Sequence, residues 1–217
     1  MMDTMRMIRE RHSVRSYQER RVEPEKTAEI REKIDAVNAA SGLHIQFVED
    51  ASNVFSGLFS RAIGWKYVPS YLAIIGKDAP DLEEKCGYYG EELVLYLQSL
   101  GLNTCWVGMF KAGSVKAAVE PDEKLVITIA VGYGANQGKQ HRSKAVEDVA
   151  DVKDMPEWFR AGVESALLAP TAINQQKFIF SLKDGEPSVR VSSPGPFVRL
   201  DLGIVKYHFE AAAGRKL

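Results

Sequence analysis

Hydrophobic positions in the first part of the chain follow helical spacing and then strand spacing. Ile30, Ile34 and Val37 follow Pro24 at the spacing of one helical face, which predicts a helix over about residues 25–40. Two strands are expected next. Ile45–Phe47 alternates apolar and polar positions, and Tyr71–Ile75 is apolar throughout and ends at Gly76. Residues 50–69 show no clear hydrophobic period, which predicts a long excursion of the chain over a pocket.

The middle of the chain predicts a further helix and two buried strands. Leu93, Tyr96 and Leu100 form a helical stripe that Gly101 closes as a left-handed cap. Residues 103–107 and 125–131 have strand patterns. The second of these strands is almost wholly apolar, so it is expected at the centre of a sheet.

A second pattern begins after Asp154. Pro156 opens a helix with Phe159, Val163 and Leu167 turned inward, and Pro170 breaks it. Asp184-Gly185 predicts a hairpin between strands at 178–180 and 189–191, with Pro187 lengthening the turn. A last helix is expected over about residues 201–213.

The order of elements in the two stretches is similar, which suggests a degenerate internal duplication. Gly90 and Gly101 are eleven residues apart, as are Gly203 and Gly214, and each pair brackets an expected helix. Helices bounded by glycine are common, so the spacing alone is equally compatible with coincidence. We therefore expect one domain over residues 1–217, with an internal repeat formed by residues 1–150 and 151–217.

Composition and charge narrow the class of protein. The 217 residues are 45% hydrophobic and 26% charged, which is ordinary for a globular chain. The formal net charge of −1 provides no overall field for nucleic acid or an acidic membrane. An uncharged run of 18 residues, Leu93–Phe110, raises the question of a membrane span, but its polar residues and glycines favour a core helix, a turn and a buried strand. With only two cysteines and no apolar leader segment, a cytoplasmic location is expected.

Arg11-His12-Ser13-Val14-Arg15 is the first segment with candidate chemistry. Alternate residues of an extended chain point the same way, so Arg11, Ser13 and Arg15 can converge on one ligand. Two guanidinium groups and a hydroxyl suit a phosphate. The alternative is a solvated basic turn after a short helix, because most surface arginines have no specific partner.

Three further segments carry candidate chemistry. Ala169–Phe178 has small and amide side chains that can hydrogen-bond a heterocycle, although Pro170 is also an ordinary helix stop. Gly101–Gly108 contains Cys105, whose apolar neighbours favour a buried structural thiol over a nucleophile. Gly132–Gly138 precedes Arg142, and its glycine spacing does not fit a Rossmann loop, but it could present cations to a phosphate. The spacing of the four histidines predicts no metal site.

Together these four segments resemble the FMN-dependent nitroreductase family. Arg11, Ser13 and Arg15 match the family's Arg-x-Ser-x-Arg segment, and Ala169–Phe178 resembles its Pro-Ser-x-x-Asn segment. Gly101–Gly108 matches its Gly-Thr-Cys-Trp-x-Gly strand, and the turn before Arg142 matches its glycine turn with a basic residue. The Pro-Ser-x-x-Asn counterpart normally follows the first segment closely, whereas here it lies near the C-terminus. The chain therefore resembles an offshoot of the family in which two truncated copies stand in tandem.

The resemblance implies an α+β fold in which helices flank a central, mostly antiparallel sheet with pseudo-duplicated halves. It implies FMN as the cofactor, bound by Arg11, His12, Ser13, Arg15, Trp106, Val107, Gly108, Arg142, Pro170, Thr171 and Asn174. No side chain is expected to be catalytic, because the flavin carries the electron chemistry. The chain could supply both sides of a flavin site as a monomer that mimics a dimer, or it could form a homodimer.

Two functions follow from the resemblance. The favoured one is an oxidoreductase that passes electrons from NAD(P)H through FMN to nitroaromatic, quinone or similar acceptors, with neither nucleic acid nor membrane as a partner. The alternative is a non-catalytic flavin-binding or sensing protein. An open aromatic loop at residues 55–67 favours the enzyme, and a lid over the flavin favours the binder.

Overall fold

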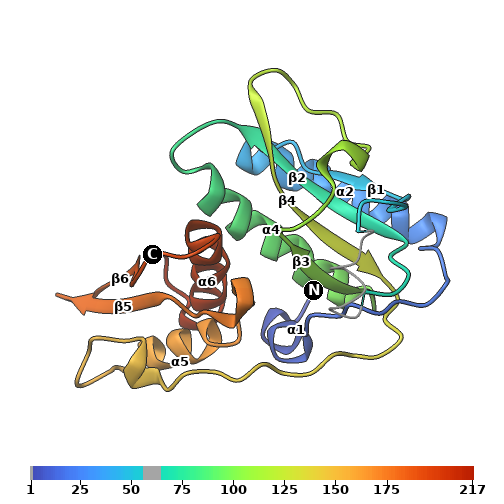
Figure 1. The fold of residues 1–217 in the computed structure, drawn as a ribbon. Helices are drawn as coiled ribbons and strands as arrows, with labels where there is room; N and C mark the ends of the chain where they lie inside the picture. Colours follow the sequence, from blue (N-terminus) through green and yellow to red (C-terminus); the bar gives the residue numbers. More distant parts are fainter. Residues whose placement is uncertain (1, 56–64) are drawn as a thin grey trace. The chain divides into compact units, whose positions relative to one another are not determined.

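The fold was analysed in a computed structural model that describes residues 2–55 and 65–217 (Figure 1). The chain forms two compact units. One, the sheet unit, comprises Arg11–Leu82 and Leu93–Lys139; the other, the hairpin unit, comprises Met1–Glu10, Glu83–Glu92 and Gln140–Leu217. Helix α4 (Leu82–Ser99) contributes to both units. Each unit is described separately below.

The sheet unit is built on an antiparallel sheet with strand order β1-β2-β4-β3. Its strands are β1 (Gln46–Val48), β2 (Ser70–Lys77), β3 (Asn103–Val107) and β4 (Glu123–Gly132). The apolar strand β4 is central, as its sequence predicts, and Ala130 pairs with Tyr71 on one side and Cys105 on the other. The antiparallel sheet flanked by helices confirms the expected fold class.

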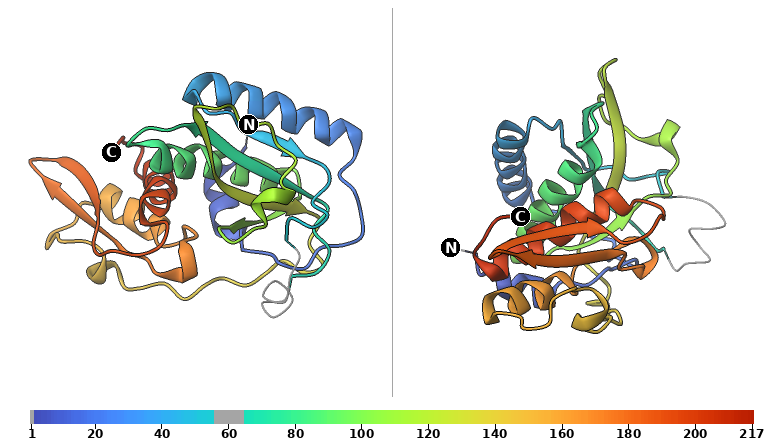
Figure 2. Two further views of the ribbon diagram at one scale, coloured as in Figure 1. Left: turned by 45° about the horizontal axis from the view of Figure 1, so that its top comes forward. Right: turned by 90° about the vertical axis from the view of Figure 1, so that its left-hand side faces the viewer.

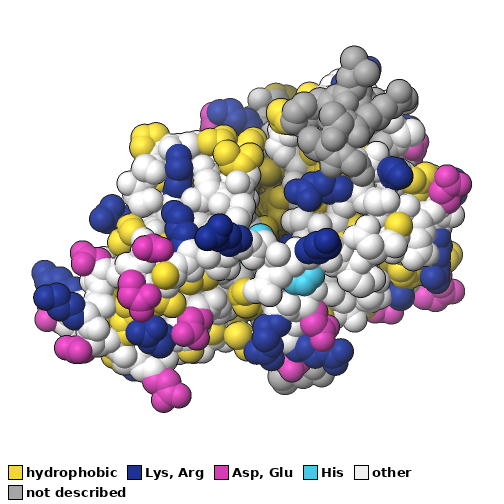
Figure 3. Space-filling model, turned by 60° about the horizontal axis from the view of Figure 1, so that its bottom comes forward, with side chains coloured by type: hydrophobic (Ala, Val, Ile, Leu, Met, Phe, Trp, Pro, Cys, Tyr) yellow, Lys and Arg dark blue, Asp and Glu magenta, His cyan; other side chains and the backbone are white. Residues whose placement is uncertain are grey.

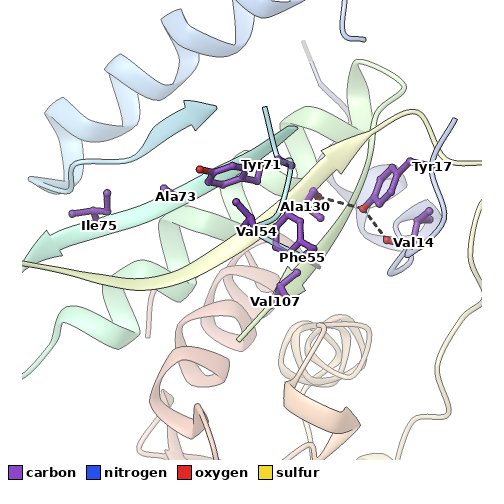
Figure 4. Packing of buried hydrophobic residues seen from close by; sticks show 10 residues of the cluster. Val14, Tyr17, Val54, Phe55, Tyr71, Ala73, Ile75, Val107 and Ala130 are labelled. Carbon is purple, nitrogen blue, oxygen red and sulfur yellow. Dashed lines mark hydrogen bonds between the residues drawn. The ribbon is translucent and has the colours of Figure 1, made fainter. Parts of the chain in front are cut away.

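One face of this sheet forms the core shown in Figure 4. Tyr71, Ala73 and Ile75 alternate along β2 and pack with Val54 and Phe55 from the segment between β1 and β2. Phe55 meets Tyr71 edge to face with ring centroids 5.9 Å apart, a favoured arrangement for aromatic pairs. The residues after β1 therefore cover the sheet before the chain returns as β2.

Two helices of the sheet unit end as their glycines predict. Helix α2 (Pro24–Ser41) begins at a proline and ends at Gly42, whose φ of 71° lets its N–H reach the Asn38 carbonyl. Gly101 follows α4 with a φ of 76°. The sequence pattern placed the apolar stripe of α4 at Leu93–Leu100, but the helix begins at Leu82. In its first turns Leu82 is the one large apolar residue that is fully buried, and the next buried positions, Cys86 and Gly87, are small, so hydrophobic spacing does not reveal these turns.

The hairpin unit surrounds an aromatic core. It contains α1 (Thr4–Glu10), α5 (Glu157–Ala166), β5 (Phe178–Lys183), β6 (Glu186–Val191) and α6 (Val198–Ala213), and Figure 2 shows the hairpin lying along α6. The Phe180 and Phe209 rings stack 4.8 Å apart, and Phe159 meets both edge to face. Helices α4 and α6 approach closely at Gly203, where a Cβ would lie 1.9 Å from the Glu84 carbonyl oxygen.

The hairpin corrects one prediction. Asp184 and Gly185 have φ values of 52° and 82° and form a two-residue turn, so Pro187 does not lengthen it. Lys183 pairs with Glu186, and Leu182 pairs with Pro187. The pair next to a two-residue turn exchanges the ladder hydrogen bonds and the following pair does not, so Pro187 occupies a position that needs no N–H donor.

The structure can be compared with two predictions from the sequence, one on a membrane span and one on charge. Leu93–Phe110 forms the end of α4, a turn and β3, as its sequence predicts. In the part of the chain that the structure describes, every helix is too short or too polar to cross a bilayer. On the face drawn in Figure 3, acidic and basic side chains are interspersed, in keeping with the balanced charge.

Candidate active site

The Arg11–Arg15 segment of the sheet unit runs beside strand β3. Ser13 forms a parallel bridge with Thr104, and the Val14 N–H donates to the Thr104 carbonyl at 3.0 Å. Val14 is buried in the core, so Ser13 and Arg15 face the opposite way. The extended conformation that the alternating pattern predicts is confirmed.

Arg11, Ser13 and Arg15 each influence the thiol of Cys105 in β3. Burial raises the pKa of the Cys105 thiol, while the charge of Arg15, a hydrogen bond with Ser13 and the charge of Arg11 each act to lower it. Because the net effect is a raised pKa, the thiol is neutral at pH 7 and adds no negative charge beside the two guanidinium groups. The cluster therefore has the charge expected of an anion site.

Tyr17 holds the backbone of this segment in place (Figure 4). Its hydroxyl donates to the Val14 carbonyl at 2.7 Å and lies 3.4 Å from the Ala130 carbonyl. The Tyr17 N–H donates to Lys66, and the Ser16 carbonyl accepts from the Ala135 N–H. Arg11 and Arg15 therefore project from a backbone that is fixed on several sides. Sequence analysis missed Tyr17, and its apolar ring beside a basic segment was the available signal.

The glycine turn at 132–138 closes against the same segment. The Asn103 side-chain oxygen accepts from the Gly134 N–H at 2.9 Å, which ties the turn to the start of β3. Gly138 has a φ of 71°, and a Cβ there would lie 2.9 Å from the His12 Cβ and 3.0 Å from the Ser13 carbonyl oxygen. Three of the four sequence motifs thus come together within one unit.

The members of the cluster differ in exposure. Arg11 is 4% exposed, whereas Arg15 is exposed and His12 is half-buried. Partial burial and the charge of Arg11 lower the pKa of His12 below its ordinary value, so this side chain is neutral at pH 7. His12 can therefore offer hydrogen bonds to a ligand but no positive charge.

Three candidate residues lie where β3 ends, and their surroundings differ: Trp106, Val107 and Gly108. Val107 is 6% exposed and belongs to the core, and its carbonyl accepts the Thr128 hydroxyl at 3.2 Å. The side chain and the carbonyl of Val107 are therefore both engaged within the sheet unit. Met109, which sequence analysis did not select, follows Gly108 and is 63% exposed.

The fourth motif forms a turn in the hairpin unit over Thr171–Gln176. The Asn174 side chain donates to the Arg142 carbonyl at 2.8 Å, and the Gln176 side chain donates to the same carbonyl at 2.9 Å. The predicted residues Arg142 and Asn174 are therefore neighbours, joined through the Arg142 backbone, which leaves its guanidinium uninvolved in these bonds. Pro170 and Thr171 begin the turn, and the Thr171 hydroxyl accepts the Gln176 N–H at 3.1 Å.

The expected excursion over a pocket is present in the described residues between β1 and β2. A cavity of about 350 Å³ is lined by Arg21 and by residues of this segment, including the stacked rings of Phe55 and Trp65. None of the predicted site residues lines this cavity. The aromatic loop at 55–67 falls partly at 56–64, which lies outside the described residues. Among the residues that are described, histidine, cysteine and acidic side chains form no group of three suited to a metal ion.

Comparison with known proteins identifies the family. Residues 3–213 match a family model described as "Putative TM nitroreductase". A search of curated proteins found no match. Among solved structures, a "putative nitroreductase" from Thermotoga maritima is 22% identical, with a TM-score of 0.67 over 97% of this chain and 83% of that one.

Two structures determined with FMN share the fold at lower identity. The one from Desulfovibrio desulfuricans is 16% identical, with a TM-score of 0.52 over 72% of this chain and 99% of that one. The one from Exiguobacterium sibiricum is 15% identical, with a TM-score of 0.52 over 70% and 98%. Because the family model spans nearly the whole sequence, the chain belongs to this nitroreductase family, a class of oxidoreductase.

Proposed function

We propose that this protein is an FMN-dependent oxidoreductase that takes electrons from NADH or NADPH and passes them to nitroaromatic, quinone or similar small acceptors. Family membership and the fold shared with two FMN complexes support the reaction class. The observation that carries the proposal for this chain is that Arg11, Ser13 and Arg15 share one extended segment, which is bridged to β3 and held by the Tyr17 hydroxyl.

The donor set of this cluster fits the phosphate of FMN. A phosphate monoester carries between one and two negative charges at pH 7 and presents several acceptor oxygens. Two guanidinium groups and a hydroxyl supply cations and donors in a geometry that suits such oxygens. The Cys105 thiol, whose raised pKa keeps it neutral, does not repel the phosphate.

The remaining predicted contacts complete the proposal. His12, Trp106, Val107 and Gly108 are assigned to the flavin ring and its edge. A second set of contacts is assigned to Arg142, Pro170, Thr171 and Asn174. FMN, when bound, supplies the hydride and electron chemistry. The protein's own residues bind and orient the cofactor, and the absence of a Cβ at Gly108 leaves room for close approach of the ring.

Titration of FMN into the apoprotein and its variants tests the binding cluster. Arg15 is exposed, so Arg15→Ala should leave the core intact and remove one charge-assisted contact. Such contacts are worth roughly 1.5–3 kcal/mol, so the FMN Kd should rise about ten- to a hundredfold. Arg142→Ala should show a loss in the same direction if the second set binds FMN.

Arg9→Ala is the matched control, because Arg9 is an exposed arginine of α1 outside the extended segment, and its Kd should stay at the wild-type value. An Arg15→Ala protein that binds FMN as tightly as the wild type contradicts the assignment of the phosphate site.

A further inference from the structure

The Thr171–Gln176 turn holds its backbone in an unusual conformation. Ile173, Asn174 and Gln176 have φ values of 48°, 56° and 46°, in the left-handed region that side chains other than glycine seldom occupy. Ile173 is β-branched, for which this region is especially unfavourable, and it is 87% exposed. Packing of its own side chain therefore does not explain the conformation. Such strain persists only where the surroundings enforce it, and it concentrates at ligand sites.

The carboxylate of Asp201 is hydrogen-bonded to the residues on either side of Ile173 and Asn174. The Ala172 N–H donates to both carboxylate oxygens at 3.0 and 3.1 Å, and the Gln175 side-chain amide donates to Oδ2 at 2.7 Å. These donors lie immediately before and after Ile173–Asn174 in the chain. Asp201 is itself 5% exposed, in the first turn of α6. One buried carboxylate thus ties both ends of the left-handed segment to the start of a helix.

The donors around Asp201 match an ionised carboxylate. Both oxygens accept N–H groups, and an ionised carboxylate has acceptors on each oxygen and no hydrogen of its own. An asparagine would place its own NH₂ group against one of these donors. A buried charge is costly, and it is usually retained where a specific arrangement depends on it.

We propose that Asp201 is a positioning residue, whose carboxylate holds the Thr171–Gln176 turn in the left-handed conformation that presents Thr171 and Asn174 to the flavin. This inference rests on the proposed function, because it takes the turn to be a flavin contact. Asp201 acts only through the turn and does not itself touch the cofactor.

The protonation of Asp201 gives the proposal a pH-dependent readout, which the side chains of the turn itself would not provide. Burial raises its pKa to about 6, while the Gln175 amide and the Ala172 N–H oppose that rise. Lys144 and Lys177 beside the turn and Arg199 in α6 are not among the groups that shift this pKa. Above pH 6 the carboxylate accepts hydrogen bonds from the Ala172 N–H and the Gln175 amide. Because these two donors lower the pKa, they bind the ionised carboxylate more strongly than the protonated one. Below pH 6 Asp201 gains a proton and remains buried, one oxygen becomes a donor, and the hydrogen bonds that hold the turn weaken.

The first experiment observes the turn without flavin. In ¹⁵N-labelled protein, the Ala172 amide proton should shift with a midpoint near pH 6, as expected for a donor to a titrating carboxylate. In Asp201→Asn that titration should disappear, and the Ile173 backbone amide signal should move toward that of an unstructured isoleucine. An Ala172 amide that titrates identically in both proteins overturns the proposal.

The second experiment measures FMN affinity. At pH 8, Asp201→Asn should bind FMN about tenfold more weakly than wild type, and the ratio of the two Kd values should approach one at pH 5. The FMN phosphate titrates in both proteins, so it cancels from this ratio. Asp184→Asn, a change at the hairpin turn of the same unit, is the control and should bind as wild type does.

The outcomes separate the positioning role from the proposed function. Wild-type affinity in Asp201→Asn, with Arg15→Ala still weakened, overturns the role of Asp201 alone. A wild-type protein that binds no FMN overturns the proposed function and the flavin role of the turn together. Should Asp201→Asn fail to fold, Gln175→Ala removes one donor without touching the carboxylate, and it should weaken FMN binding to an intermediate extent.

Discussion

Gly108 lies where β3 ends, between buried Val107 and exposed Met109. A backbone without a Cβ permits a ring to approach closely, so Gly108→Val should hinder contact between the flavin edge and the nicotinamide. Reduction of bound FMN by NAD(P)H, followed by stopped flow, should slow far more than the melting temperature falls. Gly113→Val is the control, because a Cβ at Gly113 meets nothing within 4 Å. Near-normal reduction in Gly108→Val places the reactive edge elsewhere.

The residues of the candidate site differ in how far the sequence could predict their orientation and role. The shared direction of Ser13 and Arg15 follows from the period of an extended chain, and the neighbouring core position of Val14 agrees with it. The orientation of Val107 could not be predicted, because both faces of β3 carry apolar residues and either could be the core. Asp201 gives no sequence signal, since an acidic residue in the first turn of a helix is common on dipole grounds alone.

At the scale of elements, the contact between the glycine turn and the Arg11–Arg15 segment yields a prediction with a closely matched control. Gly138 and Gly42 both have a φ of 71°, but a Cβ at Gly42 meets nothing, whereas one at Gly138 meets His12 and Ser13. Alanine at either position should cost about 1–2 kcal/mol of stability for the left-handed backbone. Only Gly138→Ala should also displace Ser13 and raise the FMN Kd, by about threefold to tenfold.

Urea unfolding and FMN titration of the two glycine variants check this prediction. Equal FMN affinities in Gly138→Ala and Gly42→Ala would show that the turn does not support the binding cluster. A loss of affinity confined to Gly138→Ala would separate the effect of the contact from the cost of the backbone conformation.

Elements with strong hydrophobic periods were predictable, and their limits depended on residues without such a signal. Helix α2 and strand β4 follow from their apolar spacing, and Gly42 and Gly101 mark helix ends. The start of α4 was missed because only Leu82 among its buried residues there is large and apolar, while Cys86 and Gly87 are small. The tight hairpin was missed because Pro187 suggests a break, although its ladder position needs no N–H donor.

For the whole molecule, local patterns do not reveal how the chain divides into units. The boundary between the sheet unit and the hairpin unit falls within α4, and residues 1–10 join residues 140–217 in the hairpin unit. A continuous helix carries no linker composition, so the sequence offers no marker there. The internal repeat over residues 1–150 and 151–217 stays a prediction, as does the monomer that would supply both sets of flavin contacts.

The visible spectrum of the FMN-loaded protein under anaerobic conditions tests the central claim most directly. NADH and NADPH are added separately, and the flavin absorption band is followed before and after addition. An FMN-dependent oxidoreductase should lose this band with at least one of the two donors, and a quinone or nitroaromatic acceptor should restore it. A bound flavin whose band neither donor bleaches would contradict the account and would identify a non-catalytic flavin-binding protein.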